Sequence, residues 1–171
     1  MSSFSISYNG SLRNLYNEDH TLGTKNGRKN ADNPTLVAGD IRALNRGLKG
    51  ISVYDFGTDE KDTKDEKTAF YKKLKAVMDT YNNSVESTST SESAETKKVS
   101  KKLAKLAKKY EKELEDVGIS LDKKGYMTIS ETAVDNYDVS RFKEVFGEDS
   151  EFMKEFTKYT KNLTRHIDQY A

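Results

Sequence analysis

Apolar residues recur every three or four positions along four long stretches of this sequence, and that spacing limits what the chain can fold into. Residues three or four apart lie on the same face of an α-helix, so each stretch predicts a helix that must bury one apolar stripe against a partner. The stripes are Val37, Ile41, Leu44, Leu48 and Ile51; Phe70, Leu74, Val77, Tyr81 and Val85; Val99, Leu103, Leu106, Tyr110, Leu114 and Val117; and Phe152, Phe156, Tyr159, Leu163, Ile167 and Tyr170. The sequence therefore predicts a mainly α fold, a coiled-coil-like bundle built around an antiparallel helical hairpin.

The second and third stripes belong to the predicted helical hairpin, residues 62–117. Asp62, Thr63 or Asp65 opens its first helix, because acidic and hydroxyl residues favour helix N-termini. The serine- and threonine-rich run 86–95 separates the two helices and predicts a turn or flexible tip. Two matching stripes joined by a short polar tip are expected to pack as an antiparallel pair.

A small β-hairpin is predicted over residues 119–129, after Gly118 ends the preceding helix. Apolar and polar residues alternate on both sides of a turn, in which Gly125 supplies a positive φ. The overlapping run 120–131 also aligns with a calcium-binding EF-hand loop, but its two lysines would repel a cation and few ligand positions carry acidic oxygens. The hairpin is therefore the favoured interpretation, and no metal site is expected.

The rest of the chain divides into an arm and one domain. Residues 1–33 are rich in Ser, Asn and Gly without a sustained period, which predicts a flexible N-terminal arm. A single helical domain is expected over 34–171. It starts with a helix for which Asn33 is the N-cap and Pro34 the first residue, and it ends in a C-terminal helix over 150–170.

The sequence offers few groups for catalysis or metal binding. It has no cysteine, which excludes disulfides, thiol catalysis and cysteine-ligated zinc. His20 and His166 are far apart and lack acidic partners at ligand spacing, and no nucleophile motif or phosphate-binding loop is present. We expect no catalytic residue, no cofactor and no metal, and hence not an enzyme; clustered titratable groups in a deep pocket would revive that alternative.

Charge is balanced overall but concentrated locally. Lys and Arg number 29 against 28 Asp and Glu, so we expect no nucleic-acid partner, and no apolar run approaches the about 20 residues of a membrane span. The run 97–109 is strongly basic. Its lysines either flank the apolar stripe and keep the helix soluble, which is the favoured interpretation, or contact an acidic partner or a membrane surface.

Three segments, in order, resemble flagellar filament cap proteins, also called hook-associated protein 2. The segment 70–83 contains an aromatic residue, a valine and the pair Tyr81-Asn82. The segment 114–129 has the order leucine, glycine-isoleucine, glycine turn and apolar strand, and 145–163 has a Phe-Gly pair before a helix with spaced aromatics. The earlier run GDIRALNRGL, which begins at Gly39, is also similar to a segment of these proteins.

The resemblance implies a bacterial, flagellum-associated structural protein that associates through its helices with itself, as a homo-oligomer, or with flagellin, after flagellar-type export. It also implies a reduced form, because the large inserted domains and long terminal coils of the family find no counterpart in this sequence. The alternative is a cytoplasmic export chaperone that holds an amphipathic helix of a client. The residues expected to pack helices or form the interface are Phe70, Leu74, Val77, Tyr81, Leu103, Leu106, Tyr110, Phe152, Phe156 and Leu163.

Overall fold

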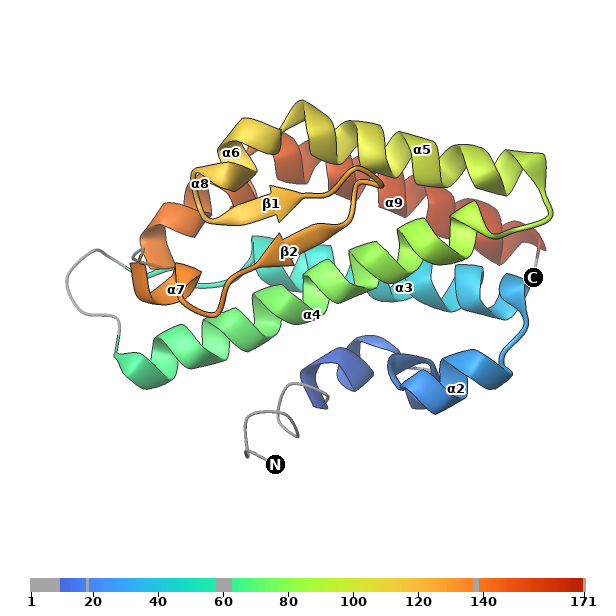
Figure 1. Cartoon of the computed structure of the whole chain (residues 1–171), viewed down its shortest axis with the longest axis horizontal. Coiled ribbons are helices and arrows are strands. Elements are labelled where there is room, and N and C mark those ends of the chain that lie inside the picture. Colours follow the sequence, from blue (N-terminus) through green and yellow to red (C-terminus); the bar gives the residue numbers. More distant parts are fainter. Residues whose placement is uncertain (1–9, 18, 58–62, 137–138, 171) are drawn as a thin grey trace.

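A computed structural model describes residues 10–17, 19–57, 63–136 and 139–170 of the chain. Four long helices lie side by side with a two-stranded sheet against them (Figure 1). The elements are α2 (Lys25–Asn30), α3 (Asn33–Ser52), α4 (Lys64–Ser89), α5 (Ala94–Lys109), α6 (Glu111–Glu115), β1 (Ile119–Leu121), β2 (Met127–Ile129), α7 (Ala133–Asn136), α8 (Lys143–Phe146) and α9 (Glu151–Tyr170), with 3-10 turns at His20–Gly23 and Val139–Phe142. The predicted mainly α class with one small β-hairpin is confirmed.

The helical bundle is formed by α3, α4, α5 and α9. Helix α3 packs against both α4 and α9, and α4 packs against α5. Arg42, in the middle of α3, contacts Asp168 near the end of α9, while Asn45, three residues later, accepts a hydrogen bond from Thr160, so these two helices are antiparallel. Successive neighbours therefore run in opposite directions, as in an up-down-up-down bundle.

The α4–α5 hairpin begins and turns as local chemistry dictates. Thr63 caps α4 in a capping box with Glu66, in which each side chain accepts a hydrogen bond from the other's backbone N–H. Helix α4 continues to Ser89, so the predicted tip over 86–95 is wrong in its first residues, and the turn is shorter than predicted. Several serine and threonine hydroxyls in this stretch are satisfied within the helix by carbonyls three or four residues back, as Thr88 donates to the Ser84 carbonyl at 2.6 Å. Asp62, the other candidate for the helix start, lies outside the described residues.

The β-hairpin is held against α4 by side chains of that helix. Strands β1 and β2 pair antiparallel with Ser120 opposite Thr128. The Asn82 amide donates to the Met127 carbonyl and accepts from the Met127 N–H, both at 2.8 Å, so it pairs with the strand as a neighbouring backbone would. Tyr81 donates to the Gly125 carbonyl at 2.8 Å. The hairpin is thereby fixed beside α4.

The core is built from the apolar stripes and from aromatic residues of the C-terminal third. Rings of Phe152 and Phe156 lie 4.6 Å apart, and Phe156 faces Tyr81 at 5.9 Å. At the other end of α4, Phe70 packs against Phe142 at 5.0 Å. The C-terminal helix, predicted over 150–170 with Ser150 as its cap, begins at Glu151. Ser150 caps it by accepting the Met153 N–H at 3.0 Å.

The expected flexible arm differs most from the structure. Residues 10–15 and 25–30 are helical, and Tyr16 and Leu22 are buried, so the prediction of an unstructured arm is wrong for the part that the structure describes; residues 1–9 and 18 lie outside it. This segment, residues 10–32 without 18, packs on α3 and is called the N-terminal segment below. It also supplies the N-cap of α3, because Asp32 and not Asn33 accepts the hydrogen bond of Thr35 N–H.

Candidate interaction surface

The ten residues predicted to pack helices or form an interface lie mostly inside the bundle. Seven are at most 4% exposed and Tyr110 is 7% exposed, whereas Leu106 and Leu163 are half-buried. The structure brings Tyr81, Tyr110, Phe152 and Phe156 into one aromatic cluster. These stripes are therefore occupied by one another within a single chain, and a partner would have to contact other side chains.

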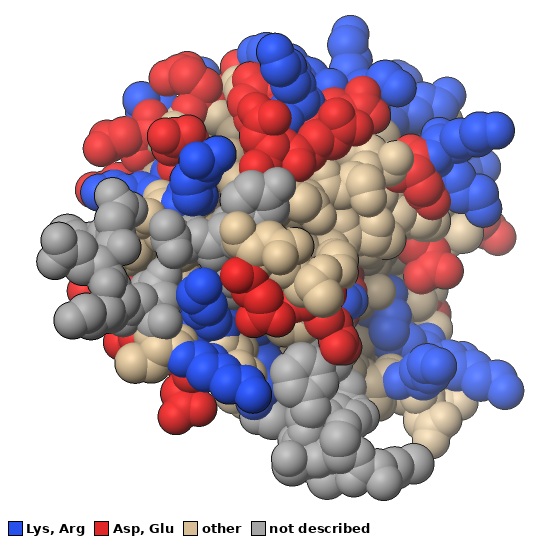
Figure 2. Space-filling view, turned by 60° about the vertical axis from the view of Figure 1, so that its left-hand side comes forward, with Lys and Arg blue, Asp and Glu red and all other residues tan. Residues whose placement is uncertain are grey.

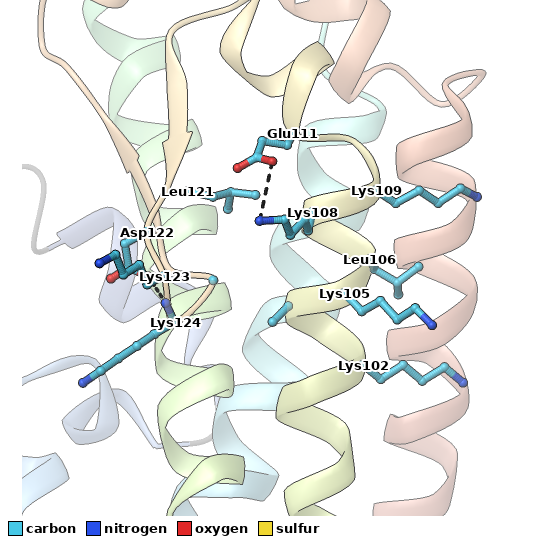
Figure 3. Close-up of a pocket in the computed structure, with 12 residues that line it drawn as sticks. Lys102, Lys105, Leu106, Lys108, Lys109, Glu111, Leu121, Asp122, Lys123 and Lys124 are labelled. Carbon is cyan, nitrogen blue, oxygen red and sulfur yellow. Dashed lines mark hydrogen bonds and ion pairs between the residues drawn. The ribbon is translucent and has the colours of Figure 1, made fainter.

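The outer face of α5 carries the basic run seen in the sequence. Helix α5 turns one apolar face inward, because Leu103 and Ala107 are fully buried, whereas the lysines of this helix are exposed. A hollow of about 720 Å³ extends over this face to the turn of the β-hairpin (Figure 3). We call this region the α5 surface; its lysines are Lys102, Lys105, Lys108, Lys109, Lys123 and Lys124.

The α5 surface has two flanks. On the flank toward the hairpin, Leu121, Lys108 and Glu111 lie in the space between strand and helix (Figure 3). On the other flank, Lys102, Leu106 and Lys109 extend from α5 toward α9. The two leucines supply apolar area among cationic side chains.

The lysines of the α5 surface outnumber the carboxylates beside them. Glu111 lies 3.9 Å from Lys108, and Asp122 accepts the backbone N–H groups of Lys124 and Tyr126 at 2.8 and 2.9 Å. Lys109 pairs with Glu155 of α9, which raises the pKa of this lysine and lowers that of the glutamate through their hydrogen bond. Lys105, Lys123 and Lys124 form no ion pair with any residue in the described part of the chain. The surface thus carries an excess of positive charge. Figure 2 shows Lys and Arg side chains, with Asp and Glu side chains among them, along the right-hand border of one face of the molecule.

Helices α5 and α9 are joined mainly by side-chain contacts. Their backbones approach at few points, and long side chains bridge the space between them. The Lys102 ammonium lies 4.5 Å from the centre of the Tyr159 ring, a cation–π contact, and burial raises the pKa of the Tyr159 hydroxyl to about 12. Val99, Leu106 and Leu163 are half-buried along this side. Apolar area therefore remains accessible between the two helices.

The hairpin turn is mounted rigidly on α5. Gly125 has a φ of 84°, and a Cβ there would lie 2.6 Å from the Ala104 Cβ. Only glycine combines this backbone conformation with so close an approach. The lysines that follow Asp122 are consequently held at a fixed position relative to α5.

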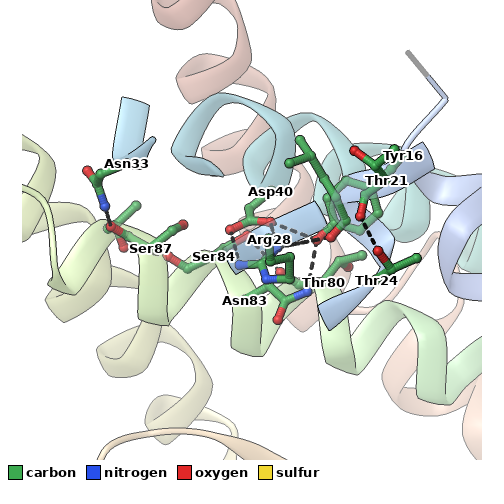
Figure 4. A network of polar contacts seen from close by, with 12 residues as sticks. Tyr16, Thr21, Thr24, Arg28, Asn33, Asp40, Thr80, Asn83, Ser84 and Ser87 are labelled. Carbon is green, nitrogen blue, oxygen red and sulfur yellow. Dashed lines mark hydrogen bonds and ion pairs between the residues drawn. The ribbon is translucent and has the colours of Figure 1, made fainter. Parts of the chain in front are cut away.

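A second polar cluster joins the N-terminal segment to α3 and α4 (Figure 4). The Arg28 guanidinium donates to both carboxylate oxygens of Asp40, at 2.6 and 3.0 Å, and Tyr16 donates to the same carboxylate at 2.7 Å. Asn83 of α4 donates to the Tyr16 hydroxyl at 2.9 Å. Asp40 and Tyr16 are at most 1% exposed, and this burial together with the carboxylate raises the pKa of Tyr16. With every member hydrogen-bonded, the cluster is suited to holding the N-terminal segment in place.

The two histidines belong neither to the α5 surface nor to the polar cluster around Asp40. His20 is in the N-terminal segment, where its Nδ1 lies 2.9 Å from the Arg13 carbonyl oxygen, and His166 is exposed on α9. Among the residues that the structure describes, no three His, Asp or Glu side chains are grouped so as to hold a metal ion. Within the same residues, no helix has the length and apolar character needed to cross a bilayer.

Sequence reasoning missed the Tyr16–Arg28–Asp40–Asn83 cluster. Arginine and aspartate twelve positions apart give no periodic signal, and Asp40 is not one of the positions of the stripe that begins at Val37. The one available signal was an acidic residue next to Ile41 on an otherwise apolar helix face, since a buried carboxylate requires a partner.

Comparison with known proteins gives no match. No family model, no curated protein and no solved structure matches this chain.

Proposed function

We propose that this chain is a non-enzymatic structural and interaction protein that binds another protein by packing it on the α5 surface. The observation that carries the proposal is the combination of two half-buried leucines with lysines on a helix and the adjacent hairpin turn, three of which form no ion pair within the described part of the chain. The bundle uses its own apolar stripes for its core, so a partner contacts the outer face of α5 instead.

The partner under this proposal is a further copy of the chain or a flagellin-like protein, reached by flagellar-type export. Its support is the sequence resemblance to filament cap proteins. Two of the resembling segments touch in the fold, because Tyr81 and Asn82 hydrogen-bond the hairpin at Gly125 and Met127. The resembling residues therefore act together in placing the hairpin turn beside α5.

The test combines light scattering with binding to purified flagellin. We expect the full chain either to form oligomers as its concentration rises or to bind immobilised flagellin, and Leu106→Ser to weaken that association without changing circular dichroism. Lys64→Glu, an exposed charge reversal at the start of α4, serves as the control. A chain that stays monomeric at all concentrations and ignores flagellin contradicts this partner assignment.

A cytoplasmic export chaperone is the second candidate. The half-buried Val99, Leu106 and Leu163 between α5 and α9 favour it, because a client helix could lie along them. This candidate requires a stable one-to-one complex with a secreted client inside the cell and no export of the chain. Cell fractionation with antibody detection distinguishes the two candidate functions, because the chaperone stays in the cytoplasm and the structural protein is exported.

A further inference from the structure

We infer that the α5 surface binds an extended, acidic segment of the partner protein, which pairs with the outer edge of β1 beside α5. This inference rests on the proposed function and adds the conformation and the charge of the bound segment. It starts from the hollow between the β-hairpin and α5 (Figure 3). Strand β1 is the strand nearer to α5, and no further strand pairs with its outer edge in the described part of the chain (Figure 1).

The peptide groups of Leu121 point away from β2. The Asp122 N–H donates to the Tyr126 carbonyl at 3.0 Å, and in an antiparallel ladder such hydrogen-bonded pairs alternate with pairs that are not hydrogen-bonded. The next pair along the ladder is Leu121 opposite Met127. The Met127 N–H and C=O are bound outside the ladder, by Asn82, as this alternation requires. Leu121 therefore presents one donor and one acceptor outward, on the side where α5 lies.

The hollow is suited to an extended chain rather than to a helix. Helix α5 lines it from Lys102 to Lys109, a rise of about 10 Å, which three residues of a strand span. The hairpin closes on α5 at its turn, where a Cβ on Gly125 would lie 2.6 Å from the Ala104 Cβ, and α6 connects α5 to the start of β1. An added strand needs about 5 Å beside β1, whereas a helix is about 10 Å wide. The space between β1 and α5 therefore favours the extended form.

The charge of the bound segment follows from the lysines around the hollow. Six lysines line it, against the two carboxylates of Glu111 and Asp122. Asp122 already accepts two backbone N–H groups of the turn, and Lys108, which lies 3.9 Å from Glu111, points into the space between helix and strand (Figure 3). Glu155, outside the hollow, pairs with Lys109. The remaining positive charge attracts acidic side chains and repels basic ones.

The strand edge and the charge together specify the kind of partner. Acidic lipids and nucleic acids would meet the lysines, but they have no peptide groups to pair with Leu121. An acidic chain segment meets both, because its backbone pairs with β1 while its carboxylates reach the exposed ammonium groups. The α5 surface therefore selects an extended acidic peptide.

The test of charge uses fluorescently labelled peptides of about eight residues. The parent peptide alternates glutamate with valine, which favours an extended chain, and a second peptide has lysine in place of every glutamate. Fluorescence anisotropy with the full chain measures binding. We expect the parent peptide to bind at least about tenfold more tightly than the lysine peptide, with an affinity that falls as salt is added. Equal affinities for these two peptides overturn the inference.

Methylated peptides test the pairing with β1. An N-methyl group removes a donor and blocks one edge of an extended chain, because the N–H groups of successive residues point to opposite edges. One version of the parent peptide is methylated at its glutamates and another at its valines. We expect one version to bind about fivefold more weakly than the other, since a single edge of the peptide pairs with β1. Two methylated peptides of equal affinity overturn the inference.

Two double variants locate the site. Lys105→Gln combined with Lys108→Gln neutralises two exposed lysines beside the hollow and should weaken binding of the parent peptide about fivefold. The matched control combines Lys49→Gln with Lys64→Gln, which neutralises two exposed lysines of α3 and α4, and should change binding less than about twofold. Unchanged melting temperatures establish that both variants are folded. An equal effect of the two double variants places the peptide elsewhere and overturns the inference.

A further arm uses vesicles of phosphatidylserine. Binding to these vesicles that is lost in the Lys105→Gln, Lys108→Gln variant, without binding to any peptide, overturns the inference in favour of a membrane surface. A chain that binds itself or flagellin but none of the peptides loses only the assignment of an extended acidic segment. One that binds no protein and no peptide loses the proposed function as well.

Discussion

At the scale of single residues, Asp40 depends on neighbours that come from other parts of the chain. It is fully buried, and its carboxylate is held by Arg28 and Tyr16 of the N-terminal segment. A buried carboxylate without such partners would be strongly destabilising. Hydrogen bonds from the N-terminal segment therefore replace the hydration that the Asp40 carboxylate loses on burial.

Replacing Asp40 by Ala tests this dependence. The change leaves the Arg28 guanidinium partly buried without its carboxylate, so we expect the free energy of unfolding to fall by about 3 kcal/mol. Urea unfolding followed by circular dichroism measures the change. The control is Lys154→Ala, which removes an exposed ion pair with Glu151 and should alter stability by less than about 0.5 kcal/mol. A loss below about 1 kcal/mol for Asp40→Ala would show that the cluster contributes little.

Asp79 predicts how stability depends on pH. Burial raises the pKa of its carboxyl to about 7 in the folded state, above the ordinary value of 3.8, so the native chain binds more protons than the unfolded chain between these values. Stability should therefore increase as the pH falls from 7 to 4. Lys75, 2.7 Å away, offsets part of the penalty for the charged form.

The variant Asp79→Asn removes this titration. We expect it to raise the free energy of unfolding by about 1–2 kcal/mol at pH 8 and to flatten the pH dependence between about pH 4 and 7. Urea titrations at several pH values measure both effects. Asp116→Asn, at an exposed position, should leave the slope of the parent protein unchanged. A parent protein whose stability rises toward pH 8 would contradict the assignment.

At the scale of elements, the β-hairpin turn and α5 are joined at one point of close approach. Gly125 needs a positive φ and has no room for a Cβ next to Ala104. In contrast, Gly50 in the last turns of α3 has no heavy atom within 4 Å of the position that a Cβ would take. The two glycines thus form a matched pair, one required by the packing and one not.

We expect Gly125→Ala to lower the free energy of unfolding by about 2–3 kcal/mol, because the left-handed backbone is strained for alanine and the helix must move away. Gly50→Ala should instead raise it by about 0.5–1 kcal/mol through its better helix propensity. Thermal melting of both variants decides the matter. Equal and small shifts in the two would show that the turn is not held tightly against α5.

At the scale of the whole molecule, the four long helices and the β-hairpin follow from local patterns. The apolar stripes at three- and four-residue spacing specify α3, α4, α5 and α9, since a helix with one apolar face must bury it. The turn at Gly125 is likewise specified by a few adjacent residues. Such elements could be predicted because the information lies within one or two turns of helix.

The packing of the N-terminal segment and the spacing of α5 and α9 could not be predicted. The first depends on Tyr16 and Asn83, which are 67 positions apart and meet only after α3 and α4 have packed. The distance between α5 and α9 depends on side chains of both helices that meet only in the fold, and the apolar stripes alone do not reveal it. The basic run was visible in the sequence, but its place beside Leu106 and Leu121 required the fold.

The pairing of α3 with α9 has a consequence for how the chain folds as it leaves the ribosome. A chain leaves the ribosome N-terminus first, whereas a domain generally folds as a unit. Helices α3, α4 and α5 are neighbours along the chain and can associate early, yet the face of α3 that receives Thr160 must wait until more than a hundred further residues are made. During that interval the nascent protein exposes the apolar surface of α3 that α9 covers in the complete fold. A ribosome stalled before α9 would therefore present a partly folded chain with exposed apolar surface to chaperones.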